Sequence, residues 1–284
     1  MNSEIGSMLI VGIFSLFLIY VAFRRGFFQL PSGEWPSFLK LRHLAIAFAI
    51  YFFSSFFLTQ LALIFWKKRI MLHYMSYSIW LSFFVSSLIF LFLLLYLLSL
   101  PRETGKNILQ KTGTPFSFSK DLKEAFYAWI VSFPLVLFLS QLLELLLMKA
   151  LHLTQVPEQI AVKFLKSTLD TPSYFVLAVL SIVVLAPLVE ETLFRGFLQS
   201  YIRKHLGAKQ AIFITSFCFS LFHFSMSQGI ANISIILPLF LLSLFLGLIY
   251  EKRGSLLSPI FLHAFFNTVS VLNLYLFGRF LGGL

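Results

Sequence analysis

The chain has 284 residues, of which 59% are apolar and only 12% are charged, and its formal net charge is +11. Soluble domains carry about 25% charged residues, so this composition and the mean hydropathy of +0.90 exclude a soluble enzyme and indicate a polytopic membrane protein. The Lys and Arg residues form short clusters between apolar segments, which is typical of membrane orientation signals and argues against nucleic-acid binding. The single Cys218 excludes an internal disulfide and a CxxC metal site.

Eight apolar segments divide the chain, each near the roughly 20 residues that a helix needs to cross a bilayer. We expect each to form one membrane-spanning helix, which predicts an all-α, polytopic membrane bundle of about eight transmembrane helices. The first segment precedes Arg24 and Arg25 and follows no positive charge, the reverse of a signal peptide, so we expect a retained span. The segments are residues 8–23, 44–66, 76–100, 125–148, 174–204, 208–224, 233–250 and 258–277.

The connecting segments predict the orientation, because cytoplasmic loops carry an excess of Lys and Arg. With the N-terminus outside, the cytoplasmic loops hold 15 of these residues and the opposite side holds 7. This excess predicts that both termini lie outside, although a basic cluster at residues 67–69 argues against it. The loops predicted to be cytoplasmic are residues 24–43, 101–124, 195–209 and 251–257.

The segment 174–204 is unlike the others because ionisable residues interrupt it. Glu190 and Glu191 follow an uncharged apolar stretch, and Arg195 comes four residues later. As one helix the segment is about 46 Å long, which places both carboxylates inside the membrane, where a charge without a function is uncommon. The alternative is that the span ends at Val189 and leaves these residues on an interfacial helix with ordinary i,i+4 pairing.

Depth along the helices favours the single long helix. Counted from the turn near Gly207, Glu190 lies about 20 Å along its helix and His223 about 22 Å along the antiparallel neighbour. The last span enters from the same side and places His263 at about 8 Å and Asn267 at about 14 Å. We therefore expect three helices to direct these four side chains toward one buried region.

Each of these residues also has a simpler interpretation. A membrane histidine often packs between helices with a satisfied hydrogen bond, and an asparagine such as Asn267 often links two helices. The phenylalanines at positions 219, 265 and 266 are interpreted as packing residues. The agreement in depth among four polar groups is what favours a functional site.

The three polar sites resemble the motifs of a known family. EETLFR at residues 190–195 is similar to its EExxxR motif, FSLFH at 219–223 to FxxxH, and HAFFN at 263–267 to HxxxN. The chain thus resembles the CAAX prenyl protease and bacteriocin-processing family of intramembrane proteases, also described as CAAX amino-terminal protease or Abi proteins. We expect one integral membrane domain, in which residues 1–150 carry no motif and residues 151–284 form the catalytic core.

This resemblance implies an intramembrane endopeptidase. Glu190 matches the catalytic glutamate and His223 its partner, and together they could deprotonate a water molecule for attack on a peptide carbonyl. Asn267, helped by His263, could donate hydrogen bonds to the developing oxyanion.

The resemblance also implies a supporting ion pair and leaves the cofactor open. Glu191 and Arg195 would form the pair that fixes the helix. One carboxylate and two imidazoles can also bind zinc, in which case the ligands would be Glu190, His223 and His263. HExxH is absent, and we favour the mechanism without a metal.

Two other functions stay open on the sequence. The first is a scaffold or immunity-type membrane protein that keeps these residues for helix packing, and the second is a proton-coupled transporter. As a protease, the protein would act on a membrane-embedded or lipidated peptide, including a prenylated CAAX-type C-terminus. We expect a multi-pass protein of the bacterial inner membrane; the sequence does not indicate its oligomeric state.

Overall fold

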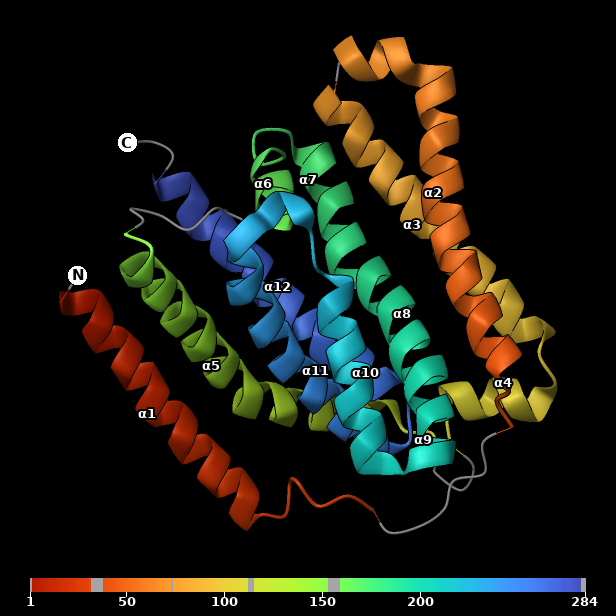
Figure 1. The fold of residues 1–284 in the computed structure, drawn as a ribbon, viewed down its shortest axis with the longest axis vertical. Helices are drawn as coiled ribbons and strands as arrows, with labels where there is room; N and C mark the ends of the chain where they lie inside the picture. Colours follow the sequence, from red (N-terminus) through yellow and green to blue (C-terminus); the bar gives the residue numbers. More distant parts are fainter. Residues whose placement is uncertain (1, 32–37, 73, 112–114, 153–158, 282–284) are drawn as a thin grey trace.

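The computed structural model describes residues 2–31, 38–72, 74–111, 115–152 and 159–281. These residues are almost entirely helical, and their β-type pairing is one isolated bridge between Gln110 and Ser255. The predicted all-α class is therefore confirmed (Figure 1). In chain order the elements are α1 (Asn2–Arg24), α2 (Leu41–Leu72), α3 (Tyr74–Ser99), α4 (Arg102–Leu109), α5 (Phe118–Ala150), α6 (Ile160–Lys166), α7 (Pro172–Val179), η1 (Leu180–Leu185), α8 (Ala186–Glu191), η2 (Thr192–Gln199), α9 (Ser200–Leu206), α10 (Ala208–Phe222), η3 (Met226–Ala231), α11 (Asn232–Arg253) and α12 (Leu257–Leu281).

Within the described residues, seven helices are long and apolar enough to cross a membrane, so the chain is a multi-pass membrane protein. The eighth predicted span, residues 208–224, forms the helix α10, but this helix has only 15 residues. At about 22 Å it is shorter than the roughly 30 Å apolar layer. The expectation of eight full-length spans is thus reduced to seven spans and one shorter helix.

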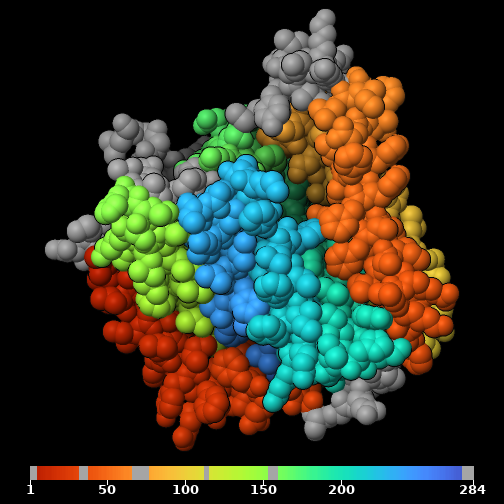
Figure 2. Space-filling view, in the orientation of Figure 1, coloured from red at the N-terminus to blue at the C-terminus, as the bar shows by residue number. Residues whose placement is uncertain are grey.

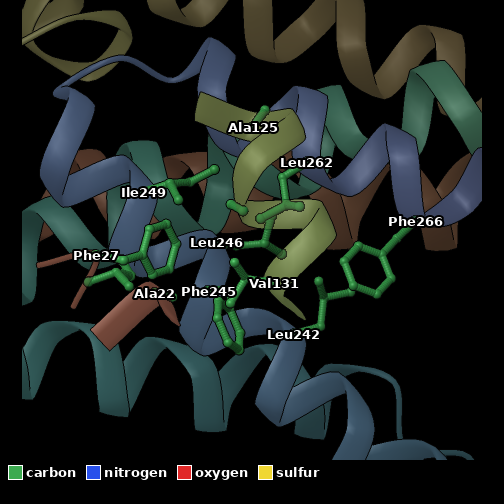
Figure 3. Close-up of a cluster of buried hydrophobic side chains, with 12 residues drawn as sticks. Ala22, Phe27, Ala125, Val131, Leu242, Phe245, Leu246, Ile249, Leu262 and Phe266 are labelled. Carbon is green, nitrogen blue, oxygen red and sulfur yellow. The ribbon is translucent and has the colours of Figure 1, made fainter. Parts of the chain in front are cut away.

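Two large hydrophobic clusters and a smaller one between α6, α7 and α12 hold the described residues of the bundle together. The first joins α1, α5, α11 and α12, and Figure 3 shows its side chains, among them Ala22, Ala125, Leu246 and Leu262. The second joins α2, α3, η2 and α10 through residues such as Ala47, Leu93, Phe197 and Phe219. Helix α11 is the central element, since 61% of the residues in the most apolar part of its span are buried inside the protein, against at most 33% in the other spans.

The parts with and without motifs share these clusters. Helix α5 belongs to the first 150 residues, yet it packs against α11 and α12 as well as α1. Helix α3 likewise contacts α7, η1 and α8. Elements of residues 1–150 and of residues 151–284 thus contact one another, and their assignment to one integral membrane domain stays a prediction.

The four connecting segments that the charge pattern assigned to the cytoplasm lie at one end of the bundle, the lower end in Figure 1. Lysine side chains and a backbone bridge link these segments to one another. The contacts are Lys252 Nζ to Phe27 O (2.8 Å), Lys204 Nζ to Leu39 O (3.3 Å) and the bridge between Gln110 and Ser255.

A buried carboxylate organises this end. Glu251 is fully buried and accepts a hydrogen bond from Gln199 Nε2 at 2.8 Å. It also pairs with Arg203 and, at 3.5 Å, with Lys111. Burial lowers the pKa of the Lys111 ammonium well below its usual value, and the nearby Glu251 opposes this shift. The cluster ties the loop after α4 to α9 and to the end of α11.

Candidate active site

The helix that carries the EExxxR residues is continuous from Pro172 to Leu206 over 35 residues. It therefore continues past Val189 without a break, as the prediction of one long helix requires. Two π-helical stretches, η1 and η2, flank the short α-helical segment α8 with Glu190 and Glu191. Such irregular turns occur preferentially at functional sites, and nothing in the apolar pattern predicted them.

Pro187 gives a physical reason for η1. The N–H of Ala186 bonds to Ser181 O, five residues back. The carbonyl of Ile182 would next need the N–H of residue 187, which proline lacks. An unpaired carbonyl within a membrane costs several kcal/mol. Asn267 Nδ2 on α12 donates to Ile182 O at 2.8 Å and satisfies it.

The position of Asn267 differs from the sequence-based expectation. Its amide is bonded to Ile182 O, eight residues before Glu190 in the long helix, or about 12 Å of helix at α-helical rise. The structure thus brings Asn267 to the π-helical turn and not to Glu190. Its expected role as an oxyanion donor stays a prediction.

Glu190 and His223 meet between α8 and the end of α10. Glu190 Oε2 lies 3.7 Å from His223 Nε2, and the two side chains are 16% and 29% exposed. The other ring nitrogen, Nδ1, lies 2.9 Å from Phe219 O. A carbonyl only accepts, so Nδ1 carries the hydrogen, and in the tautomer with a single ring hydrogen the Nε2 lone pair faces Glu190.

This pair therefore presents two acceptors to each other. The separation of 3.7 Å is too long for a hydrogen bond, and Glu190 Oε2 is buried with no hydrogen-bond partner among the residues that the structure describes. A carboxylate oxygen and an imidazole nitrogen in this arrangement can together accept both hydrogens of one water molecule. The geometry suits the activation of a water nucleophile.

Glu191 faces a different set of partners from its neighbour Glu190. Both Glu191 and Arg195 are fully buried. Arg195 Nη1 lies 3.0 Å from Glu191 Oε2 and donates a hydrogen bond to Glu191 Oε1 at 3.1 Å. His263 Nδ1 donates to the same Oε1 at 2.8 Å. Arg195 Nη2 then donates to Ser243 Oγ (2.5 Å) and Ser243 O (3.2 Å) on α11. This network joins α8, η2, α11 and α12.

Phe219 lies between the two halves of the site. It is fully buried, and its ring centroid is 4.9 Å from the ring of His223 and 5.9 Å from that of His263. The Arg195 guanidinium lies 4.6 Å from the same centroid, a cation–π contact. The sequence-based interpretation of Phe219 as packing missed this role.

The start of α12, and with it His263, is held by a second buried carboxylate. Asp121, at the start of α5, is fully buried and pairs with Arg253 Nη2 at 2.8 Å. It also accepts hydrogen bonds from Ser255 Oγ at 2.8 Å and from Ser258 Oγ at 3.1 Å. Neither Asp121 nor Ser243 was singled out in the sequence; the only signal was a lone polar residue beside or within an apolar helix.

The arrangement does not favour the three-ligand zinc site. His263 Nδ1 is bonded to Glu191, while His223 is beside Glu190. Across the described parts of the chain, no group of three or more His, Cys, Asp or Glu residues is placed to hold a metal ion.

Residues 172–269 match the family model of the type II CAAX prenyl endopeptidase Rce1-like proteins. The match runs from the start of α7 into α12 and contains all three motifs, whereas α1 to α6 lie outside it. No curated protein and no solved structure matches the chain significantly.

Proposed function

We propose that this chain, whose residues 172–269 match the family model of the type II CAAX prenyl endopeptidase Rce1-like proteins, is an intramembrane endopeptidase. It hydrolyses a peptide bond of a membrane-associated substrate with a water molecule activated by Glu190 and His223. The observation that supports this proposal is the 3.7 Å approach of Glu190 Oε2 and His223 Nε2, two acceptors from neighbouring helices.

The proton transfers follow from this geometry. Glu190 takes a proton from the water as its oxygen attacks the peptide carbonyl, and the carbonyl becomes a tetrahedral oxyanion. The protonated Glu190 then gives this proton to the departing amide nitrogen, the C–N bond breaks, and a carboxylic acid and an amine result. His223, with Nδ1 bound to Phe219 O, keeps Nε2 directed toward the water throughout.

Glu191, Arg195 and His263 act as positioning residues in this proposal. Their network fixes α8 against α11 and α12, so that Glu190 keeps its place next to α10. For Asn267 we propose a positioning role as well, since one of its N–H groups holds Ile182 O. An amide has two N–H donors, and oxyanion binding by Asn267 would require the second.

The substrate class follows from the membrane setting and the family. We propose a membrane-embedded or lipidated peptide, with a prenylated C-terminal CAAX sequence as the first candidate. We also propose that the protein lies in the bacterial inner membrane, because its chain is short and basic. Fractionation of cells that express it at native level tests this placement.

The test of the activity uses protein reconstituted in lipid vesicles with two probes: a farnesylated CAAX peptide and an unlipidated single-span peptide. Wild type should cleave at least one of them. Glu190→Gln and His223→Gln should each lower the rate about 100- to 10,000-fold, the range typical of general base catalysis. Glu144→Gln, an exposed carboxylate on α5, is the matched control and should cleave at the wild-type rate.

Two outcomes would contradict the proposal. Full activity of Glu190→Gln would show that this carboxylate is not the base. Failure of the wild type on both probes, with proton flux that depends on Glu190, would favour the transporter instead. For the metal, we expect full activity in a sample shown to be free of zinc; loss on zinc removal and recovery on its return would overturn the metal-free mechanism.

A further inference from the structure

A cavity of about 470 Å³ lies beside Glu190, between α2, α3 and the η1–α8 part of the long helix. Glu190, Val189 and Ala186 line it on the side of the long helix. Figure 2 shows the surface hollowed next to the orange α2, with the green long helix visible at the floor of the hollow. The two other walls, α2 and α3, lie outside the segment that matches the family model.

A row of hydroxyl groups on α2 lines this cavity. Tyr51, Ser55 and Thr59 follow one another at i, i+4 and i+8, which places them on one face of the helix. Within this row, Thr59 Oγ1 donates to Ser55 O at 2.7 Å. Each hydroxyl oxygen keeps further hydrogen-bonding capacity.

A second row with the same spacing lines the cavity from α3. It consists of Ser78, Ser82 and Ser86, again at i, i+4 and i+8. For the side chains of Ser82 and Ser86 the described residues supply no hydrogen-bond partner. An apolar helix gains nothing from such hydroxyls in contact with lipid, so their alignment on one wall of a cavity is informative.

The two rows lie at the same depth. Tyr96 Oη donates to His43 O at 3.3 Å, which sets the register of the antiparallel helices α2 and α3. Counting from this contact, Ser55 is level with residue 84, which is two residues, or about 3 Å, from Ser82. The same offset applies to the other pairs, and since the hydroxyls of each row repeat about every 6 Å, the two rows overlap in depth and are staggered by about half a repeat.

The spacing of the rows suits an extended peptide. Hydroxyls four residues apart on a helix repeat every 6 Å or so, and equivalent backbone groups of an extended chain repeat every two residues, roughly 6.6–6.8 Å. Over the three hydroxyls of one row, the helical repeat and the repeat of the extended chain differ by about 1.5 Å in total. Rotation of the hydroxyl groups can compensate for this difference. A peptide strand within a membrane needs partners for its N–H and C=O groups, and hydroxyls can donate or accept.

We infer that this cavity, here called the hydroxyl cleft, binds the substrate of Glu190 as an extended peptide segment inside the bilayer, held by the hydroxyl rows of α2 and α3. The inference deepens the proposed function and rests on it. Glu190, whose buried Oε2 has no hydrogen-bond partner in the described part of the chain, lies among the lining residues and so next to the bound strand. The α2 wall spans Tyr51 to Leu63, about 18 Å of helix, or about five extended residues.

The consequence is a substrate class defined by its backbone. The cleft selects a membrane-inserted polypeptide that is locally unwound for about five residues beside the scissile bond, whichever lipid it carries. We expect the cleft not to bind a helical segment, because the backbone N–H and C=O groups of a helix already bond to one another.

The test compares two lengths of the probe peptide that the wild type cleaves, one full-length and one cut to two residues on each side of the scissile bond. The double variant Ser82→Ala/Ser86→Ala should raise KM for the long peptide about tenfold, with kcat changed less than about twofold, as expected for two lost hydrogen bonds. The cut peptide should show no change. Ser87→Ala, on the same helix with its hydroxyl bound to Phe83 O, is the control and should behave as wild type.

Binding to a Glu190→Gln background separates this inference from the proposed function, because it needs no cleavage. Both long probes, the farnesylated and the single-span peptide, are titrated in lipid nanodiscs, and the double serine variant should weaken binding about tenfold. Thr59→Val, which removes one hydroxyl from α2 at constant volume, should weaken it in the same direction. Equal losses for the long and the cut peptide would overturn the inference, because the rows are proposed to hold the longer segment, and so would unchanged binding and KM.

Discussion

Replacing Asn267 with alanine removes the Nδ2 donor that bonds to Ile182 O at 2.8 Å. The carbonyl cannot turn to the helix for a replacement, because Ala186 N–H is bonded to Ser181 O and Pro187 has no N–H. Leaving a buried acceptor unsatisfied costs about 1–3 kcal/mol. We expect Asn267→Ala to lower the free energy of unfolding by this amount.

A double-mutant cycle tests the physical reason. Pro187→Ala supplies an N–H five residues after Ile182, so it should reduce the cost of Asn267→Ala. We expect a coupling of about 1–2 kcal/mol between the two substitutions, within the range seen for residues that share one hydrogen-bond network. Unfolding by denaturant in detergent micelles, followed by circular dichroism, measures each corner of the cycle.

The result that would refute this reasoning is additivity. If Asn267→Ala costs the same with proline as with alanine at position 187, the carbonyl of Ile182 is not what Asn267 satisfies. Asn267→Leu gives a control for volume, since it fills the space without a donor and should cost as much as Asn267→Ala or more.

Three further predictions follow from the buried groups. Glu191→Ala leaves the buried Arg195 unpaired and should destabilise the protein by about 3–5 kcal/mol, measured as loss of folded protein in a thermal scan; a stable variant would contradict the network. Lys111→Met should stabilise the protein at neutral pH, because burial lowers the pKa of Lys111 below 10.5 and the unfolded chain then binds more protons. The free energy of unfolding of the wild type therefore rises as the pH approaches 10.5. Denaturant titrations should show the difference in stability between Lys111→Met and wild type shrinking over that range. A difference that stays constant with pH would contradict this reasoning. Phe219→Leu should lower kcat more than it raises KM, because the ring contacts both histidines; a change in KM alone would contradict this.

Simple counting along helices predicted much of the architecture and one half of the site. The composition required helices, and the rise of 1.5 Å per residue placed Glu190 and His223 at one level, where the structure has them 3.7 Å apart. The same count also required the helix to continue past Val189, as it does.

The counting failed where the helix departs from uniform geometry. It treats every turn alike, whereas η1 and η2 each shift the direction in which later side chains point. As a result, it could not tell that His263 binds Glu191 and that Asn267 binds Ile182. The length of α10 was missed for a related reason, because an apolar pattern does not show where a helix ends within the membrane.

Other partners were invisible because the sequence carries no signal for contacts across helices. In the sequence, Ser243 is an ordinary polar residue within an apolar segment. In the structure, Arg195 donates hydrogen bonds to both its hydroxyl and its carbonyl. The hydroxyls of α2 and α3 have helical spacing in the sequence, but only their arrangement around one cavity gives that spacing a meaning.

The most direct test of the central claim is a single turnover of wild-type protein in isotopically labelled water, with the new carboxylate of the product and the side chain of Glu190 analysed by mass spectrometry. If Glu190 and His223 activate water, the label enters the product in that first turnover and Glu190 stays unlabelled. Label in Glu190 together with an unlabelled product would mean that the carboxylate itself attacks the peptide, and the account of this site would be wrong.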